Sequence, residues 1–147
     1  MADQLYVGPT GGNRFSCGRG PLARGGLVFV RFASEKVFRR AAVHTGAPYT
    51  LAPKHLAPLL GLTSSKVKDD CTCATPFGPL RCLLYSMDLF LLASRGSDVL
   101  IPQATVAFPD NHWPEHRIIL GMTNCLDQVS LGLNSPPSSF FFGSPIE

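Results

Sequence analysis

The sequence predicts an all-β protein, and three features of its composition support this fold class. Fourteen glycines and thirteen prolines among 147 residues are typical of many short strands joined by tight turns. Ten phenylalanines and three tyrosines add side chains that are enriched in strands. With 45% hydrophobic and only 16% charged residues, the chain is too apolar to be disordered as a whole. Its length fits one domain, or one domain with a tail.

Residues 1–26 are expected to form a flexible, basic, glycine-rich arm, and residues 27–147 the folded domain. Glycine recurs through the arm, and its hydrophobic residues show no regular spacing. Seven basic residues and two acidic ones lie within residues 1–40, so the net charge of +3 comes from this end of the chain. A mildly basic chain does not by itself indicate a nucleic-acid partner. Contact of the arm with RNA or an acidic protein remains an alternative to a solvated tail.

The domain is expected to begin with a hairpin of two strands. Residues 27–32 are β-branched and aromatic, which favours a strand, and residues 37–43 continue this pattern after a short turn. Glycine and proline in residues 44–48 predict the loop that follows.

Residues 53–60 predict one short helix. Proline suits its first turn, and Gly61 suits the position just past its end. Leu56, Leu59 and Leu60 are expected to share one face, because residues three and four apart are neighbours on a helix surface.

The second half of the chain predicts further short strands. Residues 66–75 are polar and alternating, residues 76–79 predict a turn, and residues 80–92 predict a long strand that bends near Asp88. A single helical turn is expected over residues 124–128. The remaining strands are expected over residues 99–108, 117–121, 129–133 and 140–142.

Two segments, taken together, resemble the retropepsin-like aspartic proteases, the single-domain relatives of retroviral protease. Residues 41–50 contain His44-Thr45-Gly46-Ala47, and residues 117–124 contain Ile119-Leu120-Gly121. The family has Asp-Thr-Gly-Ala after apolar residues, then a flap hairpin, and later an apolar-apolar-Gly triplet. The resemblance covers about residues 27–143. It implies a closed barrel with one short helix and a flap hairpin.

His44 occupies the position of the family's catalytic aspartate, and this departure governs the expected chemistry. In the family, as the resemblance implies, a homodimer brings two carboxylates together, and like charges so close share one proton. One carboxylate activates water while the other donates a hydrogen bond to the peptide carbonyl. Neutral imidazole instead presents one donor and one acceptor nitrogen. We therefore expect little or no peptidase activity by the usual mechanism, because loss of an acid–base group costs about 10²–10⁴ in rate.

The remaining residues of the resemblance can keep a structural role without the aspartate. It implies that Thr45 hydrogen-bonds across a homodimer and that Gly46 permits a tight loop. It also implies that Ala47, Phe77 and Gly78 contact a bound peptide, the last two from the tip of the flap. The expected function is a catalytically impaired homologue that retains a dimeric groove for a peptide or protein ligand. Phe140-Phe141-Phe142 is expected to be core or subunit interface.

Two other functions remain open. The chain could be an active aspartic peptidase in which His44 is an altered aspartate codon, since the two codons differ by one base. It could also be a structural or metal-binding β protein unrelated to peptides.

No metal or other cofactor is expected. Cys71 and Cys73 are separated by a single residue, which is tight for a zinc pair. Pro114 disfavours a helix that would align His112 with His116. Two ligands from a pair of His44 side chains would be too few for a tight site.

A reducing, cytoplasmic location is the final expectation. Residues 1–4 lack the pattern of a secretory signal, and five cysteines cannot all pair within one chain. The most apolar stretch, residues 80–93, contains Arg81 and Asp88 and is shorter than the roughly 20 residues of a spanning helix. A membrane protein is therefore not expected.

Overall fold

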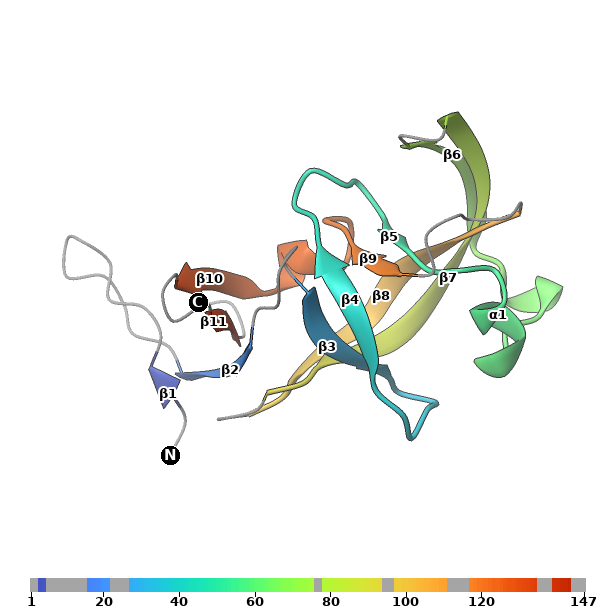
Figure 1. The fold of residues 1–147 in the computed structure, drawn as a ribbon. Helices are drawn as coiled ribbons and strands as arrows, with labels where there is room; N and C mark the ends of the chain where they lie inside the picture. The colour runs from blue at the N-terminus through green and yellow to red at the C-terminus, as the bar shows by residue number, and fades with distance from the viewer. Residues whose placement is uncertain are drawn as a thin grey trace.

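The computed structural model describes residues 3–4, 16–21, 27–75, 78–93, 97–110, 117–134 and 139–143. Its main unit is a closed barrel of six strands, in which each strand pairs with two others in the order β3-β4-β9-β5-β8-β7 and back to β3 (Figure 1). The barrel strands are β3 (Leu27–Phe32), β4 (Arg39–Val43), β5 (Thr50–Leu51), β7 (Gly78–Leu91), β8 (Val99–Pro109) and β9 (Ile118–Leu120). The predicted all-β class is confirmed, as is a closed barrel with one short helix.

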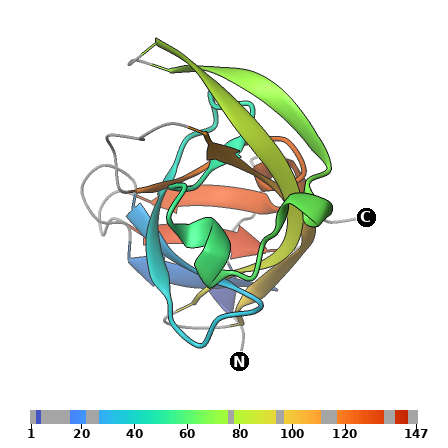
Figure 2. The ribbon, with the colours of Figure 1, turned by 90° about the vertical axis from the view of Figure 1, so that its right-hand side faces the viewer.

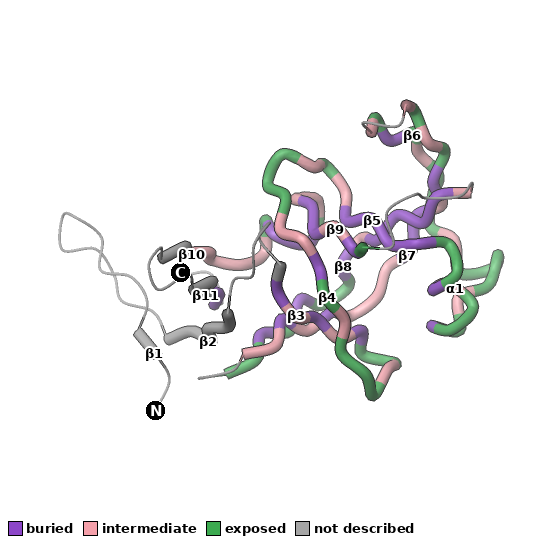
Figure 3. Tube along the Cα trace, in the orientation of Figure 1, coloured by how far each residue is buried: buried purple, intermediate pink, exposed green. Residues whose placement is uncertain are grey.

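The barrel interior is built from alternating apolar residues, as expected where successive side chains point to opposite faces of a strand. On β3, Val28, Val30 and Phe32 are buried, whereas Phe29 and Arg31 between them are half-buried. Other barrel strands contribute further residues with no exposed surface, and Figure 3 marks the buried parts of the chain in purple. These residues include Leu89, Leu91, Ile101 and Val106 on the long strands and Leu120 on β9.

Strand β7 is long and pairs with three strands, β6 (Asp69–Thr75) in its first half, β3 near its end and β8 along most of its length, and it bends where the sequence predicts. Its register with β8 shifts between Met87 and Leu89, which places the irregularity at Asp88. The carboxylate Oδ1 of Asp88 accepts hydrogen bonds from the backbone N–H of Gln103 at 2.9 Å and from its side-chain amide at 3.2 Å. Gln103 has a φ of 52°, so the Asp88 side chain supports a strained backbone position on the opposite strand.

The helix is shorter than predicted, and one of the three leucines expected on its face is not buried. Helix α1 spans Leu56–Leu59, followed by the 3₁₀ turn η1 (Ser64–Lys66). Leu56 and Leu60 are 3% and 7% exposed, but Leu59 is 67% exposed. The prediction of one shared leucine face is therefore wrong for Leu59. The helix ends at Leu59, so Leu60 lies just past it, and the three leucines do not share a continuous helical face.

The flap hairpin consists of β6 (Asp69–Thr75) and the first half of β7, paired in antiparallel register from Asp69↔Leu84 to Thr75↔Gly78. Figure 2 shows this hairpin extending beyond the barrel and arching above it. A hairpin at this place in the chain was expected from the polar, alternating sequence and the turn that follows it.

A second sheet has the order β1-β2-β11-β10. Its strands are β1 (Asp3–Gln4), β2 (Ser16–Pro21), β10 (Ser130–Asn134) and β11 (Ser139–Gly143), and the 3₁₀ turn η2 (Leu126–Gln128) precedes β10. No strand was predicted within residues 1–26, yet β2 pairs with β11 from Pro21↔Ser139 to Gly18↔Phe142. Strand β2 forms through backbone pairing, which a glycine-rich sequence does not signal.

The chain just after β9 passes very close to the backbone of Tyr49 and Thr50, where the chain enters β5. We call this close approach the crossing. Strand β9 runs parallel to β4 and antiparallel to β5, so it lies between them. A methyl group on Gly121 would lie 2.3 Å from both the carbonyl carbon and oxygen of Tyr49 and 2.8 Å from the nitrogen of Thr50. The backbones meet closely enough that only glycine fits at position 121.

Gly121→Ala is expected to lower the free energy of unfolding by about 3 kcal/mol or to prevent folding, because neither backbone can move without opening the barrel. Gly61→Ala is the matched control. Gly61 has open space around its Cα but a φ of 69°, so we expect a loss of about 1 kcal/mol from backbone strain alone. Urea unfolding measures both. An equal loss of unfolding free energy in Gly121→Ala and Gly61→Ala would contradict the close approach of the two backbones at Gly121.

Candidate functional site

The loop that follows β4 is bound to the segment that follows β9. The backbone N–H of His44 donates to the carbonyl of Leu120 at 3.0 Å, and that of Met122 donates to the carbonyl of Ala47 at 2.9 Å. Thr123 N–H donates to the carbonyl of Pro48 at 2.8 Å. The two segments that carry the family resemblance therefore meet in space, and the hydrogen bonds between them hold His44 at the end of β4.

Thr50 is the buried polar residue beneath this loop. It has no exposed surface, and its Oγ1 accepts the backbone N–H of Gly121 at 3.0 Å. The Thr50 hydroxyl also lowers the pKa of the Cys125 thiol, against the larger effect of burial, which raises it. A buried donor left without an acceptor costs about 1–3 kcal/mol, so Thr50 stabilises the crossing by giving the Gly121 N–H a partner.

A groove of about 120 Å³ lies between this loop and the flap hairpin. Its walls come from three parts of the chain: the loop after β4, the β5–β9 region, and β6 of the flap. The lining residues are His44, Gly46, Ala47, Pro48, Tyr49, Leu51, Cys73, Ala74, Thr75 and Ile119. Most of this surface is apolar, and it continues into a small core cluster that includes Leu51, Leu84 and Ala107.

His44 is exposed on the loop after β4, and Gly46 defines the orientation of its ring. The backbone N–H of Gly46 donates to Nδ1 of His44 at 3.2 Å. A methyl group on Gly46 would lie 3.0 Å from Cε1 and 3.3 Å from Nδ1 of the same ring. The absence of a side chain at Gly46 thus lets the imidazole lie against the loop backbone. Because Nδ1 accepts, the neutral imidazole carries its proton on Nε2.

No carboxylate lines the groove among the residues that the structure describes. Glu35, one of the acids nearest to His44 in sequence, forms hydrogen bonds with the guanidinium of Arg39 at 2.5–3.1 Å. Asp69 and Asp70 are exposed at the start of β6. The described groove therefore has a histidine but no acid that could replace the family aspartate.

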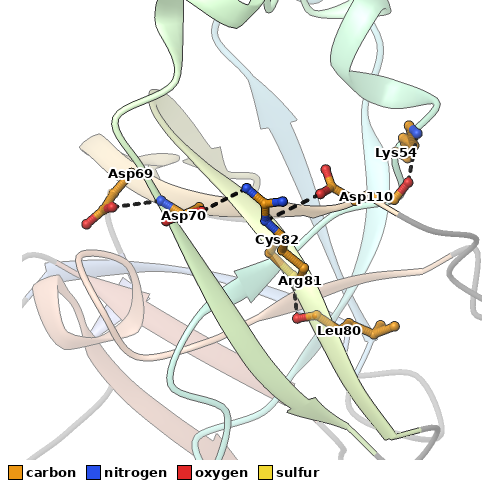
Figure 4. A network of polar contacts seen from close by, with 7 residues as sticks. All are labelled: Lys54, Asp69, Asp70, Leu80, Arg81, Cys82 and Asp110. Atoms are coloured by element: carbon orange, nitrogen blue, oxygen red, sulfur yellow. Dashed lines mark hydrogen bonds and ion pairs between the residues drawn. The ribbon is translucent and has the colours of Figure 1, made fainter.

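The base of the flap hairpin carries a network of exposed polar contacts, which Figure 4 shows. Arg81 of β7 donates to the Asp70 carboxylate at 3.0 Å and lies 3.8 Å from that of Asp110. Lys54 reaches the Asp110 carbonyl at 2.7 Å. Such exposed ion pairs contribute little to stability. They therefore add little to the free energy that holds the hairpin on the barrel.

Three free thiols lie together on the hairpin: Cys71, Cys73 and Cys82. Sγ of Cys71 and Sγ of Cys73 are 3.6 Å apart, and Cys82 is opposite Cys71 in the register. Burial, with the neighbouring thiol as a second cause, raises the pKa of Cys71 to about 12. Burial also raises the pKa of Cys73 to about 11 and that of Cys82 above its usual value.

These thiols do not form a metal site in the described part of the chain. No group of three or more histidine, cysteine, aspartate or glutamate side chains there has an arrangement that could hold a metal ion. The fourth described thiol, Cys125, is buried away from the hairpin, and burial raises its pKa to about 11.

The residues predicted for the site fall into three groups. His44, Gly46 and Ala47 line the groove, whereas Thr45 is exposed on the same loop. Phe77 lies outside the described residues, as do His112 and His116. Gly78 begins β7 with a φ of 99°, and its carbonyl accepts the hydroxyl of Thr75 at 2.7 Å, but it is not among the groove residues.

Sequence reasoning missed several residues of the groove. Pro48, Tyr49 and Leu51 line it from the loop and β5, and Cys73 and Ala74 line it from the flap. Strand β5 has only two residues, which is too short for a period to be recognised. The apolar character of Tyr49 and Leu51 beside the loop was the available signal.

The chain matches no family model and no curated protein. Among the described residues, no helix has the length and apolarity needed to cross a membrane.

The raised thiol pKa values predict slow alkylation. Thiolate is the reactive form, so at pH 7.5 Cys71, Cys73 and Cys125 should react with iodoacetamide roughly a thousandfold more slowly in the folded protein than in urea, and Cys82 should also react more slowly. The rate should rise about tenfold per pH unit between pH 8 and 10. Mass spectrometry measures the alkylation rate, and a Cys17→Ser variant removes the reaction of the fifth thiol, that of Cys17. Complete labelling of the folded protein within minutes at pH 7.5 would contradict the buried cluster.

Proposed function

We propose that the protein is a retropepsin-like homologue that binds an extended peptide in a homodimeric groove and has lost most or all peptidase activity. One observation carries this proposal: the His44 loop, Ile119 of the Ile119-Leu120-Gly121 segment and the flap hairpin line the same groove. The family resemblance leads us to expect these three elements around one groove, and this agreement supports the proposal. Their convergence links three stretches of sequence that lie far apart in the chain.

The loss of activity follows from the groups at the groove. Peptide hydrolysis by an aspartic dyad needs two carboxylates that share one proton, so that one holds water and the other polarises the carbonyl. The described groove has no carboxylate, and Nδ1 of His44 is already occupied by the Gly46 N–H. The nitrogen that remains, Nε2, is a donor in the neutral ring and cannot accept a proton from water.

The size and character of the groove favour a peptide over a small cofactor. Its volume of about 120 Å³ is below the roughly 300–1,000 Å³ of a typical small-molecule site. An apolar space of this size suits one side chain of an extended segment. The segment would lie between the flap and the loop and add its backbone hydrogen bonds to strand edges, as in other cases of strand addition.

The homodimer is supported by the exposure of the loop tip. His44, Thr45 and Gly46 are all exposed, although the backbone behind them is firmly hydrogen-bonded to Leu120 and Met122. A rigid, exposed loop suits contact with a second copy related by a two-fold axis, because an isologous interface places the same loop on both sides.

Reversion of His44 to aspartate tests the proposal. His44→Asp should gain pepstatin-sensitive cleavage of a peptide library between pH 4 and 7, because the rest of the site remains. The wild-type protein should cleave at most about 10⁻² as fast. His55→Asp, which adds an acid at another exposed histidine, is the matched control and should stay inactive. Wild-type cleavage that is lost in His44→Ala would contradict the predicted impairment.

Sedimentation measures the predicted dimer. The wild-type protein should sediment as a dimer, and Thr45→Val should weaken association about tenfold, as expected for the loss of one hydrogen bond at each copy of the loop. Thr72→Val is the matched control, because Thr72 is exposed on the flap and outside the groove. A protein that remains monomeric at high concentration would contradict the dimeric groove.

A further inference from the structure

We propose that the groove recognises a carboxylate group of its peptide ligand, through a hydrogen bond from Nε2–H of His44. This inference rests on the proposed function, because it names the ligand chemistry of the same groove. It follows from the direction of the hydrogen bond between Gly46 and His44 and from the absence of competing acids in the described lining.

The first step is the polarity of the imidazole. A neutral imidazole has one acceptor nitrogen and one N–H. The acceptor, Nδ1, takes the backbone N–H of Gly46 at 3.2 Å. Nε2 is therefore left with the proton, and the polar group that His44 offers to a ligand is a donor. The matching ligand group is an oxygen acceptor.

The second step is the fixed position of this donor. The backbone of His44 is held on both sides, by its N–H to Leu120 and by its carbonyl, which accepts the Ala47 N–H at 3.0 Å. The ring lies against Gly46, where a methyl group would approach Cε1 to 3.0 Å. A donor already oriented before binding loses little side-chain entropy when a ligand arrives.

The third step is the lack of competition for the donor. No aspartate or glutamate is among the described groove residues. The acids on the hairpin lie at its exposed base, and Asp70 there pairs with Arg81 at 3.0 Å. An anionic oxygen accepts a hydrogen bond more strongly than a neutral carbonyl does, so among oxygen acceptors a carboxylate is favoured.

Two sources can supply this carboxylate: the C-terminus of a peptide, or an aspartate or glutamate side chain within it. The apolar lining around His44, formed by residues such as Ala47, Leu51 and Ile119, suits an aliphatic neighbour of the acidic group. The ligand chemistry is thus a carboxylate beside apolar residues in an extended segment.

Fluorescence anisotropy with matched labelled peptides tests the inference. One arm compares valine-rich pentapeptides with free and amidated C-termini, and the other compares C-terminally amidated pentapeptides with a central Asp or Asn, or Glu or Gln. At least one carboxylate peptide should bind the wild-type protein about tenfold more tightly than its amide partner. The arm that shows the difference identifies the source.

Variants at His44 assign the effect to the ring. His44→Phe should abolish the preference for the carboxylate, because it keeps a ring and removes the donor. His44→Gln should retain much of it, because the glutamine amide supplies an N–H of similar reach. His55→Phe is the matched control and should bind as the wild type does. His44 and His55 are both exposed, so we expect all three variants to fold, which circular dichroism verifies.

The possible outcomes separate this inference from the proposed function. A carboxylate preference that disappears in His44→Phe supports the inference. Equal binding of acid and amide peptides, or a preference unchanged in His44→Phe, overturns it and leaves the peptide groove intact. Failure of every peptide to bind the wild-type protein and His44→Asp overturns the proposed function, and the inference with it.

Discussion

The close approach of Gly121 to the backbone of Tyr49 and Thr50 is the constraint on which the rest of the structure depends. A single methyl group at this point would overlap the Tyr49 carbonyl at 2.3 Å. Because β9 lies between β4 and β5, and the His44 loop is hydrogen-bonded to Leu120 and Met122, the contact that sets β9 against the chain entering β5 also positions this loop. The Thr50 hydroxyl accepts the Gly121 N–H, so this dense crossing is achieved without leaving a buried donor unpaired.

The groove and any catalytic group within it depend on different residues, and this separation makes a binding protein without catalysis physically consistent. Backbone hydrogen bonds, a glycine and apolar side chains shape the groove. None of these needs an acid at position 44. The histidine changes the chemistry of the site instead, because its hydrogen bond with Gly46 leaves a donor where an ionised aspartate would present only acceptors.

The flap hairpin combines a defined register with weak attachment at its base. Seven residue pairs align β6 with β7, and the buried thiols Cys73 and Cys82 pack between the hairpin and the barrel. The ion pairs of Arg81 are exposed and contribute little. Groove residues Cys73, Ala74 and Thr75 come from this hairpin, so its position sets the width of the groove.

The sequence by itself determined the all-β class, most strand positions and the bend at Asp88, because burial on alternate faces and turn chemistry are local properties. It also marked the two segments that meet at His44. Tertiary structure alone decided that β2 and β5 are strands, that Leu59 is exposed, and that Tyr49 and Leu51 line the groove. The orientation of the His44 ring rests instead on a local contact, the hydrogen bond from the Gly46 N–H to Nδ1. The other features depend on hydrogen bonds and contacts between residues far apart in the chain, which no local pattern records.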